Sequence, residues 1–168
     1  LHEQDVERAL RIFHETAQRN PTSPAALQAL VFEGFCHLRQ ERFQPAAQAL
    51  EPLLSRFQEP GLIAQAALYL GESLTGLGRF DDAARAYQRA LAPNGQPQDT
   101  PPWSDLARFG LGWALYRSDR CAQSLDAFEQ YLAQTRDGDR RTEALYAQGN
   151  CLMRLGQERE ALSRFERL

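Results

Sequence analysis

Apolar residues recur along this chain at every third or fourth position, and the stretches between them are rich in proline, glycine and polar residues. This is the spacing of amphipathic helices separated by turns, so the pattern predicts an all-α protein. The predicted helices cover residues 3–18, 24–40, 43–57, 61–77, 80–92, 102–118, 121–135, 140–155 and 158–168.

The links between these helices carry the residues that begin helices. Ser23 is predicted to cap the helix that begins at Pro24, and Thr100 precedes a proline in the same way. The stretch from Ala92 to Asp105 holds several prolines and is predicted as the one long loop. A tolerated insertion is a better interpretation of this loop than a binding loop, because long loops add little closure entropy.

One glycine recurs inside a helical pattern four times along the chain. Gly34, Gly71, Gly112 and Gly149 follow one another at intervals of 37, 41 and 37 residues. A glycine within a helix costs about 1 kcal/mol relative to alanine. Because this cost is repeated in register, the glycines indicate a packing requirement shared by four repeated units.

Two further positions repeat with the glycines. Twelve residues after each glycine comes a small residue, and four positions later comes a large apolar one. The small residues are Ala46, Ala83, Ser124 and Ala161, and the large ones are Leu50, Tyr87, Phe128 and Phe165. We expect glycine and the small residue to let two antiparallel helices approach closely, and the large residue to fill the space toward the next hairpin.

This spacing resembles the tetratricopeptide repeat, in which a Leu-Gly pair is followed by Ala and then by an aromatic residue. Ser124 stands in the Ala position here, and His37 stands where the family has Tyr. The resemblance implies a right-handed α-solenoid of antiparallel helix hairpins. Its predicted units are a lone second helix in residues 1–20, then repeats in 24–60, 61–97 and 101–138, and a truncated repeat in 139–168.

In repeats of this family the first helices line a concave groove, which implies a set of partner-binding residues. They are Phe35, Arg39, Glu72, Phe109, Trp113, Arg117, Tyr146, Asn150 and Arg154. Aromatic residues and arginines of this kind are enriched at interface hot spots. The alternative is structural: Val31, Leu68 and Phe109 would pack between neighbouring hairpins, and the dipole at a helix C-terminus favours arginine without any ligand.

Composition limits the classes of partner. The chain has 43% hydrophobic residues and a net charge of -3, which is typical of a globular protein. This near-neutral balance argues against a nucleic-acid partner, which normally needs a clustered basic face. All 19 basic residues are Arg, and no apolar run is long enough to predict direct membrane insertion.

No arrangement of residues predicts catalysis, a cofactor or a metal site. His2, His14 and His37 fall in different units, and we expect His37 to be a packed, hydrogen-bonded imidazole. Cys36, Cys121 and Cys151 make an odd count without a CxxC spacing, so they are interpreted as small buried hydrophobic residues.

Two functional hypotheses remain open at this stage. The first is a non-catalytic module that binds a partner protein or peptide in the groove, as a scaffold for a bacterial complex. The second is a structural spacer of a longer protein, which contacts only its own chain or copies of itself. The chain begins and ends within predicted helices, so we expect it to be a fragment, and an enzymatic role would require a catalytic part outside it.

The compartment is predicted from two opposing signals. The Asn20-Pro21-Thr22-Ser23 link is similar to repeats of bacterial envelope proteins such as the Tol-Pal coordinator and outer-membrane assembly lipoproteins, which favours the periplasm. Three unpaired cysteines favour the cytoplasm, where thiols stay reduced.

Overall fold

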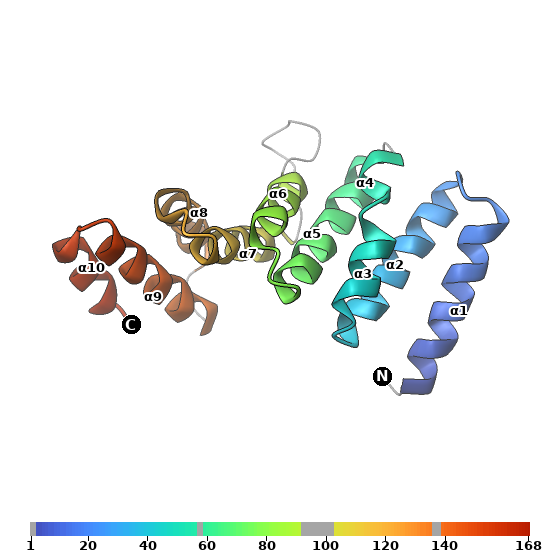
Figure 1. The fold of residues 1–168 in the computed structure, drawn as a ribbon, viewed down its shortest axis with the longest axis horizontal. Coiled ribbons are helices and arrows are strands. Elements are labelled where there is room, and N and C mark those ends of the chain that lie inside the picture. The colour runs from blue at the N-terminus through green and yellow to red at the C-terminus, as the bar shows by residue number, and fades with distance from the viewer. Residues whose placement is uncertain (1–2, 57–58, 92–102, 136–138) are drawn as a thin grey trace.

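The computed structural model describes residues 3–56, 59–91, 103–135 and 139–168, and within them it contains helices and no strand. The helices follow one another along a single elongated row, with α1 and α10 at opposite ends (Figure 1). They are α1 (Glu3–Arg19), α2 (Pro24–Arg39), α3 (Phe43–Leu50), α4 (Leu53–Arg56), α5 (Pro60–Gly76), α6 (Phe80–Leu91), α7 (Ser104–Arg117), α8 (Cys121–Gln134), α9 (Asp139–Arg154) and α10 (Glu158–Phe165).

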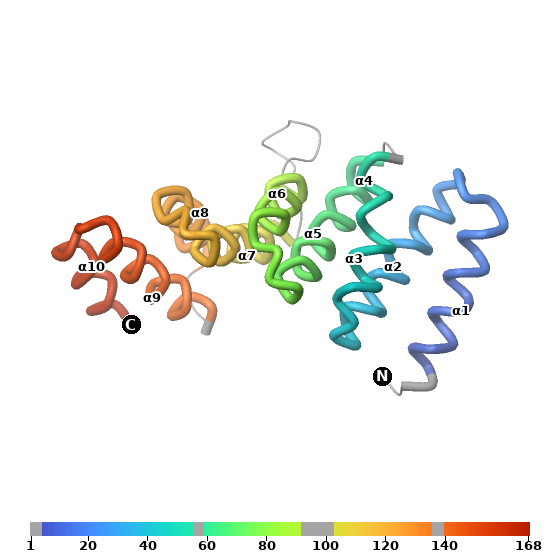
Figure 2. The backbone as a smooth tube through the Cα atoms, in the orientation of Figure 1, coloured from blue at the N-terminus to red at the C-terminus, as the bar shows by residue number. Residues whose placement is uncertain are grey.

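Antiparallel neighbours along the chain form four hairpins: α2 with α3, α5 with α6, α7 with α8, and α9 with α10. The path of the backbone turns back at each of these pairs (Figure 2). The first helices also contact one another in order, α2 with α5, α5 with α7 and α7 with α9. They form one continuous layer, and the predicted all-α solenoid is confirmed.

A local sequence signal begins α2. Ser23 caps α2 as predicted, because its Oγ accepts a hydrogen bond from the Ala26 N–H at 3.1 Å. The single helix predicted for residues 43–57 is wrong, since the helix is interrupted at Glu51 and Pro52, between α3 and α4, although Glu51 itself keeps helical backbone angles. Proline has no N–H to donate to the preceding turn, and its ring crowds that turn. Thr100 and most of the predicted long loop lie outside the described residues.

Each repeated glycine faces the large residue sixteen positions later in its own hairpin. A Cβ atom at Gly71 would lie 2.7 Å from the Tyr87 ring, and one at Gly112 would lie 2.7 Å from the Phe128 ring. The same relation holds for Gly34 with Leu50 and for Gly149 with Phe165. Real Cβ atoms do not approach this closely, so only glycine lets the second helix come this near.

The large residue was expected to fill the space toward the next hairpin, and this expectation needs a correction. Its main contact is with the glycine of its own hairpin. Tyr87 does both, because a Cβ atom at Gly110 of the following hairpin would also collide with its ring. The small position next to this contact is fully buried, and at Ser124 the hydroxyl donates a hydrogen bond to the Gly112 carbonyl at 2.9 Å. Serine is tolerated there because its polar group is paired.

All four hairpins turn in the same way between their two helices. The residue seven after each repeated glycine has a positive φ: Glu41 (57°), Gly78 (73°), Asp119 (61°) and Gly156 (73°). The next N–H then bonds to the carbonyl five residues earlier, as from Arg79 to Leu74 at 2.9 Å. This is a Schellman ending of the first helix. This ending was not predicted from the sequence, because only two of these four residues are glycine.

We predict that Gly71→Ala lowers the free energy of unfolding by about 1–3 kcal/mol, because the added methyl group displaces the Tyr87 ring. Gly61→Ala in the same helix is the control, since nothing lies within 4 Å of its Cβ position, and it should be neutral or slightly stabilising. Urea denaturation followed by circular dichroism measures both. Equal effects of the two variants would contradict the close approach.

We also predict that Glu41→Gly raises the free energy of unfolding by about 1 kcal/mol, because a left-handed conformation costs a residue with a Cβ atom roughly this much. Gly78→Ala, at the equivalent turn, should lower the free energy of unfolding by a similar amount. Both are measured by urea denaturation. If the two changes act in the same direction, the shared turn geometry is wrong.

Candidate functional site

The first helices line a hollow with a volume of about 540 Å³ that reaches from α2 to the first turn of α9. We call it the inner hollow. Its lining residues are Phe35, Arg39, Leu68, Tyr69, Glu72, Thr75, Tyr87, Trp103, Leu106, Phe109, Gly110, Trp113 and Arg140. Because these residues come from every first helix, stacking of the hairpins is what creates the hollow.

Five of the nine residues predicted to bind a partner line this hollow together. They are Phe35, Arg39, Glu72, Phe109 and Trp113. Phe109 is also buried, and Val31 and Leu68 are almost fully buried, so the packing role considered for these three residues fits their positions.

The other four predicted residues lie elsewhere. The Arg117 guanidinium lies 4.6 Å from the centre of the Phe80 ring, at the boundary between the second and third hairpins. Arg154 lies at the next boundary, with Nη1 3.0 Å from Asp119 Oδ1. Tyr146 is half-exposed on α9, and Asn150 is partly buried on the same helix. None of the four lines the inner hollow.

Two aromatic pairs contribute to the wall. The Phe35 and Tyr69 ring centres lie 5.0 Å apart, and those of Phe109 and Trp113 lie 6.3 Å apart. Between these pairs, the Tyr87 hydroxyl lies 3.3 Å from that of Thr75. Burial raises the pKa of Tyr87 well above its ordinary value, so its hydroxyl stays protonated. The wall therefore presents the faces and edges of aromatic rings, and neighbouring side chains pack against these rings.

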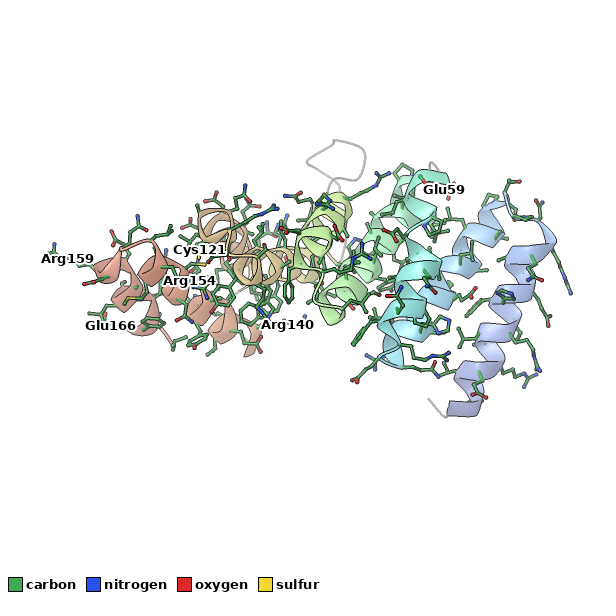
Figure 3. The ribbon with its side chains drawn as sticks, viewed as in Figure 1. Glu59, Cys121, Arg140, Arg154, Arg159 and Glu166 are labelled. Carbon is green, nitrogen blue, oxygen red and sulfur yellow. The ribbon has the colours of Figure 1, made fainter. Side chains whose placement is uncertain are left out.

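Three charged groups face the hollow. The carboxyl of Glu72 is partly buried, and burial raises its pKa above the usual range although the charges of Arg140 and Arg39 oppose the shift. Arg140 lies 5.6 Å from the centre of the Phe109 ring and extends from α9 toward the middle of the row (Figure 3). Among the described residues, neither Arg39 nor Arg140 forms a salt bridge.

Sequence reasoning missed several residues of the wall. Trp103 and Arg140 each stand nine residues before the glycine of their hairpin, at a register position that the groove prediction did not include. The same position holds Ala25 and Leu62 in the first two hairpins, so no repeated residue type pointed to it. Trp103 also leaves its buried Nε1 without a hydrogen-bond partner in the described part of the chain.

The structure confirms the predicted burial of two cysteines and corrects the predictions for Cys36 and His37. Cys121 and Cys151 are buried as predicted, whereas Cys36 is only partly buried. His37 is packed, but its buried Nδ1 has no hydrogen-bond partner among the described residues, so the predicted hydrogen-bonded imidazole is wrong at this atom. Burial and the charge of Arg42 lower the pKa of His37 against the opposing effect of Glu33.

The described residues contain no cluster of three or more histidine, cysteine or acidic residues that could hold a metal ion. None of their helices has both the length and the apolar character that a membrane span requires.

Comparison with known families identifies the architecture. The family model described as tetratricopeptide repeat matches residues 37–99 and 107–168. The chain belongs to the tetratricopeptide-repeat family. No curated protein matches this tetratricopeptide-repeat chain in sequence.

Solved structures with the same fold share little sequence with this tetratricopeptide-repeat chain. A crystal structure of MamA superposes with a TM-score of 0.77 at 19% identity, covering 98% of this chain and 86% of MamA. The MamA fragment of Desulfovibrio magneticus RS-1 gives 0.74 at 16% identity, covering 96% and 82%. YrrB, described as a TPR protein with an unusual peptide-binding site, gives 0.75 at 21% identity, covering 97% and 76%. At these identities the likeness establishes the fold.

We predict that Glu72→Gln raises the free energy of unfolding at neutral pH. Because burial raises the pKa of Glu72, the folded protein holds a proton there more tightly than the unfolded chain, so the ionised carboxylate opposes folding. This opposition is present above the folded-state pKa and disappears as the pH falls below the ordinary value of 4.5.

Thermal denaturation over a pH series should therefore show a stabilising difference at neutral pH that shrinks in acid. Glu143→Gln, an exposed position on α9, controls for the loss of one negative charge. A difference between Glu72→Gln and the parent that does not change with pH would contradict the raised pKa.

Proposed function

We propose that this chain is a non-catalytic module that binds a segment of a partner protein in the inner hollow. The observation that carries the proposal is the combination in one wall of aromatic ring surface with two arginines, Arg39 and Arg140, that form no salt bridge among the described residues although both lie near Glu72. Aromatic and arginine side chains around a concave surface are typical anchors of protein interfaces.

The chemistry of the wall defines the segment that it suits. Ring pairs such as Phe35 with Tyr69 suit an aromatic or aliphatic side chain inserted between them. The guanidinium groups, which form no salt bridge among the described residues, suit a carboxylate close to that side chain, because arginine binds carboxylates in bidentate geometry. Glu72 disfavours a long acidic run, so we expect one or two carboxylates beside an apolar anchor.

The family and one structural neighbour support a binding role of this kind. Tetratricopeptide arrays present extended concave surfaces, and YrrB is described as having a peptide-binding site. The finer assignment, a scaffold within a bacterial complex of the cell envelope, rests on the Asn20-Pro21-Thr22-Ser23 link and is part of the same proposal.

A random peptide library displayed on phage provides the test, since it needs no known partner. We predict that selection on the chain enriches peptides that place an aromatic or aliphatic residue next to Asp or Glu. The double change Arg39→Glu and Arg140→Glu should weaken their binding at least about tenfold, because each unfavourable charge contact costs 1.4 kcal/mol or more. Isothermal titration calorimetry measures the affinity.

Arg11→Glu is the matched control, because Arg11 is exposed on α1 and does not line the hollow. It should leave the affinity within about twofold of the parent. If selection enriches no peptides, or if both variants bind the enriched peptides as the parent does, the hollow is not the binding site.

A structural spacer is the second candidate, and an exposed apolar surface on the last hairpin favours it. The exposed large apolar residues there are Tyr146, Met153, Leu155, Leu162 and Leu168. Such a surface suits stacking against another copy of the chain. Light scattering over a concentration series distinguishes the two: a spacer would associate through this surface, and Met153→Gln with Leu162→Gln would abolish the association without affecting peptide binding.

A further inference from the structure

Glu72 is the acidic residue that lines the inner hollow, and its carboxyl has no partner in the described part of the chain. It forms no salt bridge there, and no hydrogen bond reaches its side-chain oxygens. These oxygens do not belong to the buried, unpaired polar atoms of the described residues either, so they are open to the hollow. The carboxylate is therefore free to accept hydrogen bonds from a group that enters.

Aromatic rings line the hollow on both sides of α5, the helix that carries Glu72. The Phe35 ring, from α2, pairs with the ring of Tyr69, one turn before Glu72 on α5. Phe109 lies on α7, the next first helix. Ring faces attract cations, and this hollow already holds one, because the Arg140 guanidinium lies 5.6 Å from the centre of the Phe109 ring. An open carboxyl among such rings suits a guanidinium or ammonium group.

Two arginines in the same lining exclude a cation that comes alone. Arg39 belongs to the first hairpin, Glu72 to the second and Arg140 to the fourth, and all three line the hollow. The two guanidinium charges repel an incoming cation, so it has to arrive with carboxylates that neutralise them. In hairpin order the lining is positive, negative and positive. A complementary segment is negative, positive and negative.

Covering the hollow increases the need of Glu72 for a partner. Burial already raises the pKa of Glu72, although the charges of Arg140 and Arg39 oppose this shift. The two arginines thus offset only part of the desolvation of the carboxylate. A bound segment removes more water, so Glu72 then either pairs with a donor or takes up a proton. Pairing is favoured near neutral pH, where protonation of a carboxyl costs free energy.

We propose that the inner hollow recognises a segment of alternating charge, in which an arginine or lysine side chain pairs with Glu72 and carboxylates on either side of it pair with Arg39 and Arg140. This rests on the proposed function and specifies the segment that the hollow binds. Neighbouring first helices lie roughly 8–10 Å apart, and an extended segment advances about 3.3 Å per residue. The base therefore stands about three residues from the acid that meets Arg39.

Four synthetic peptides of equal length, blocked at both ends, test this pairing. The arginine peptide is Asp-Ala-Phe-Arg-Ala-Phe-Asp, and the glutamine and glutamate peptides replace its Arg with Gln or Glu. The segregated peptide, Asp-Asp-Phe-Ala-Ala-Phe-Arg, has the composition of the arginine peptide with its charges separated. Isothermal titration calorimetry at neutral pH measures the affinities. We expect the arginine peptide to bind at least about tenfold more tightly than each of the others.

Exchanging the charge at residue 72 separates pairing from an effect on the fold. Glu72→Gln should bind the arginine and glutamine peptides within about twofold of each other, and Glu72→Arg should prefer the glutamate peptide. Glu143→Gln, which is exposed on α9 and lies outside the hollow, should keep the preference of the parent. Circular dichroism checks that each variant is as helical as the parent.

Three results would overturn the proposal and leave the proposed function standing. They are equal affinities for the arginine and glutamine peptides, an unchanged preference in Glu72→Arg, and library peptides that bind in the hollow without a basic residue. Equal affinities with proton uptake, seen in buffers of different ionisation enthalpy, would show that Glu72 is protonated instead. Both proposals fail if no designed or library peptide loses affinity when Arg39→Glu and Arg140→Glu are combined.

Discussion

The contact between a backbone without a side chain and a large apolar side chain sets the distance between the helices of every hairpin. At Gly71 and Gly112 this side chain is an aromatic ring that occupies the place a Cβ atom would take. Glycine weakens the helix that carries it, but the lost helical propensity is offset by burial of a whole ring or leucine side chain. The repetition of this contact gives each hairpin the same thickness, and hairpins of equal thickness can stack in a row.

Stacking in turn produces the features that carry function. The first helices touch one another in order, so their side chains form a continuous wall with a hollow along it. Residues far apart in sequence, such as Arg39 and Arg140, face the same space only because four hairpins repeat one geometry. The second helices and the turns form the opposite layer, where boundary contacts such as that of Phe80 with Arg117 determine how adjacent hairpins meet.

The repeated positions were predictable because a glycine in a helix is an unusual residue that must have a cause. The inner hollow was only partly predictable. The groove prediction took one position from each turn of the first helices, and these positions include Trp113 but not Trp103. Arg117 and Arg154 contact Phe80 and Asp119 of the preceding hairpin. Arg39 stands at the same register and lines the hollow, so register alone did not decide which of these arginines face it. The turns were missed because the left-handed position is glycine in only two of the four hairpins, and Glu41 is not a residue type that favours this geometry.

The ring of Tyr87 lies between two glycines, Gly71 in its own hairpin and Gly110 in the next, while the side chain also forms part of the wall of the inner hollow. The Tyr87 side chain thus belongs both to the contact between two hairpins and to the wall that a bound partner would face. A partner held against this part of the wall would therefore lie beside the side chain that sets how closely the second and third hairpins pack.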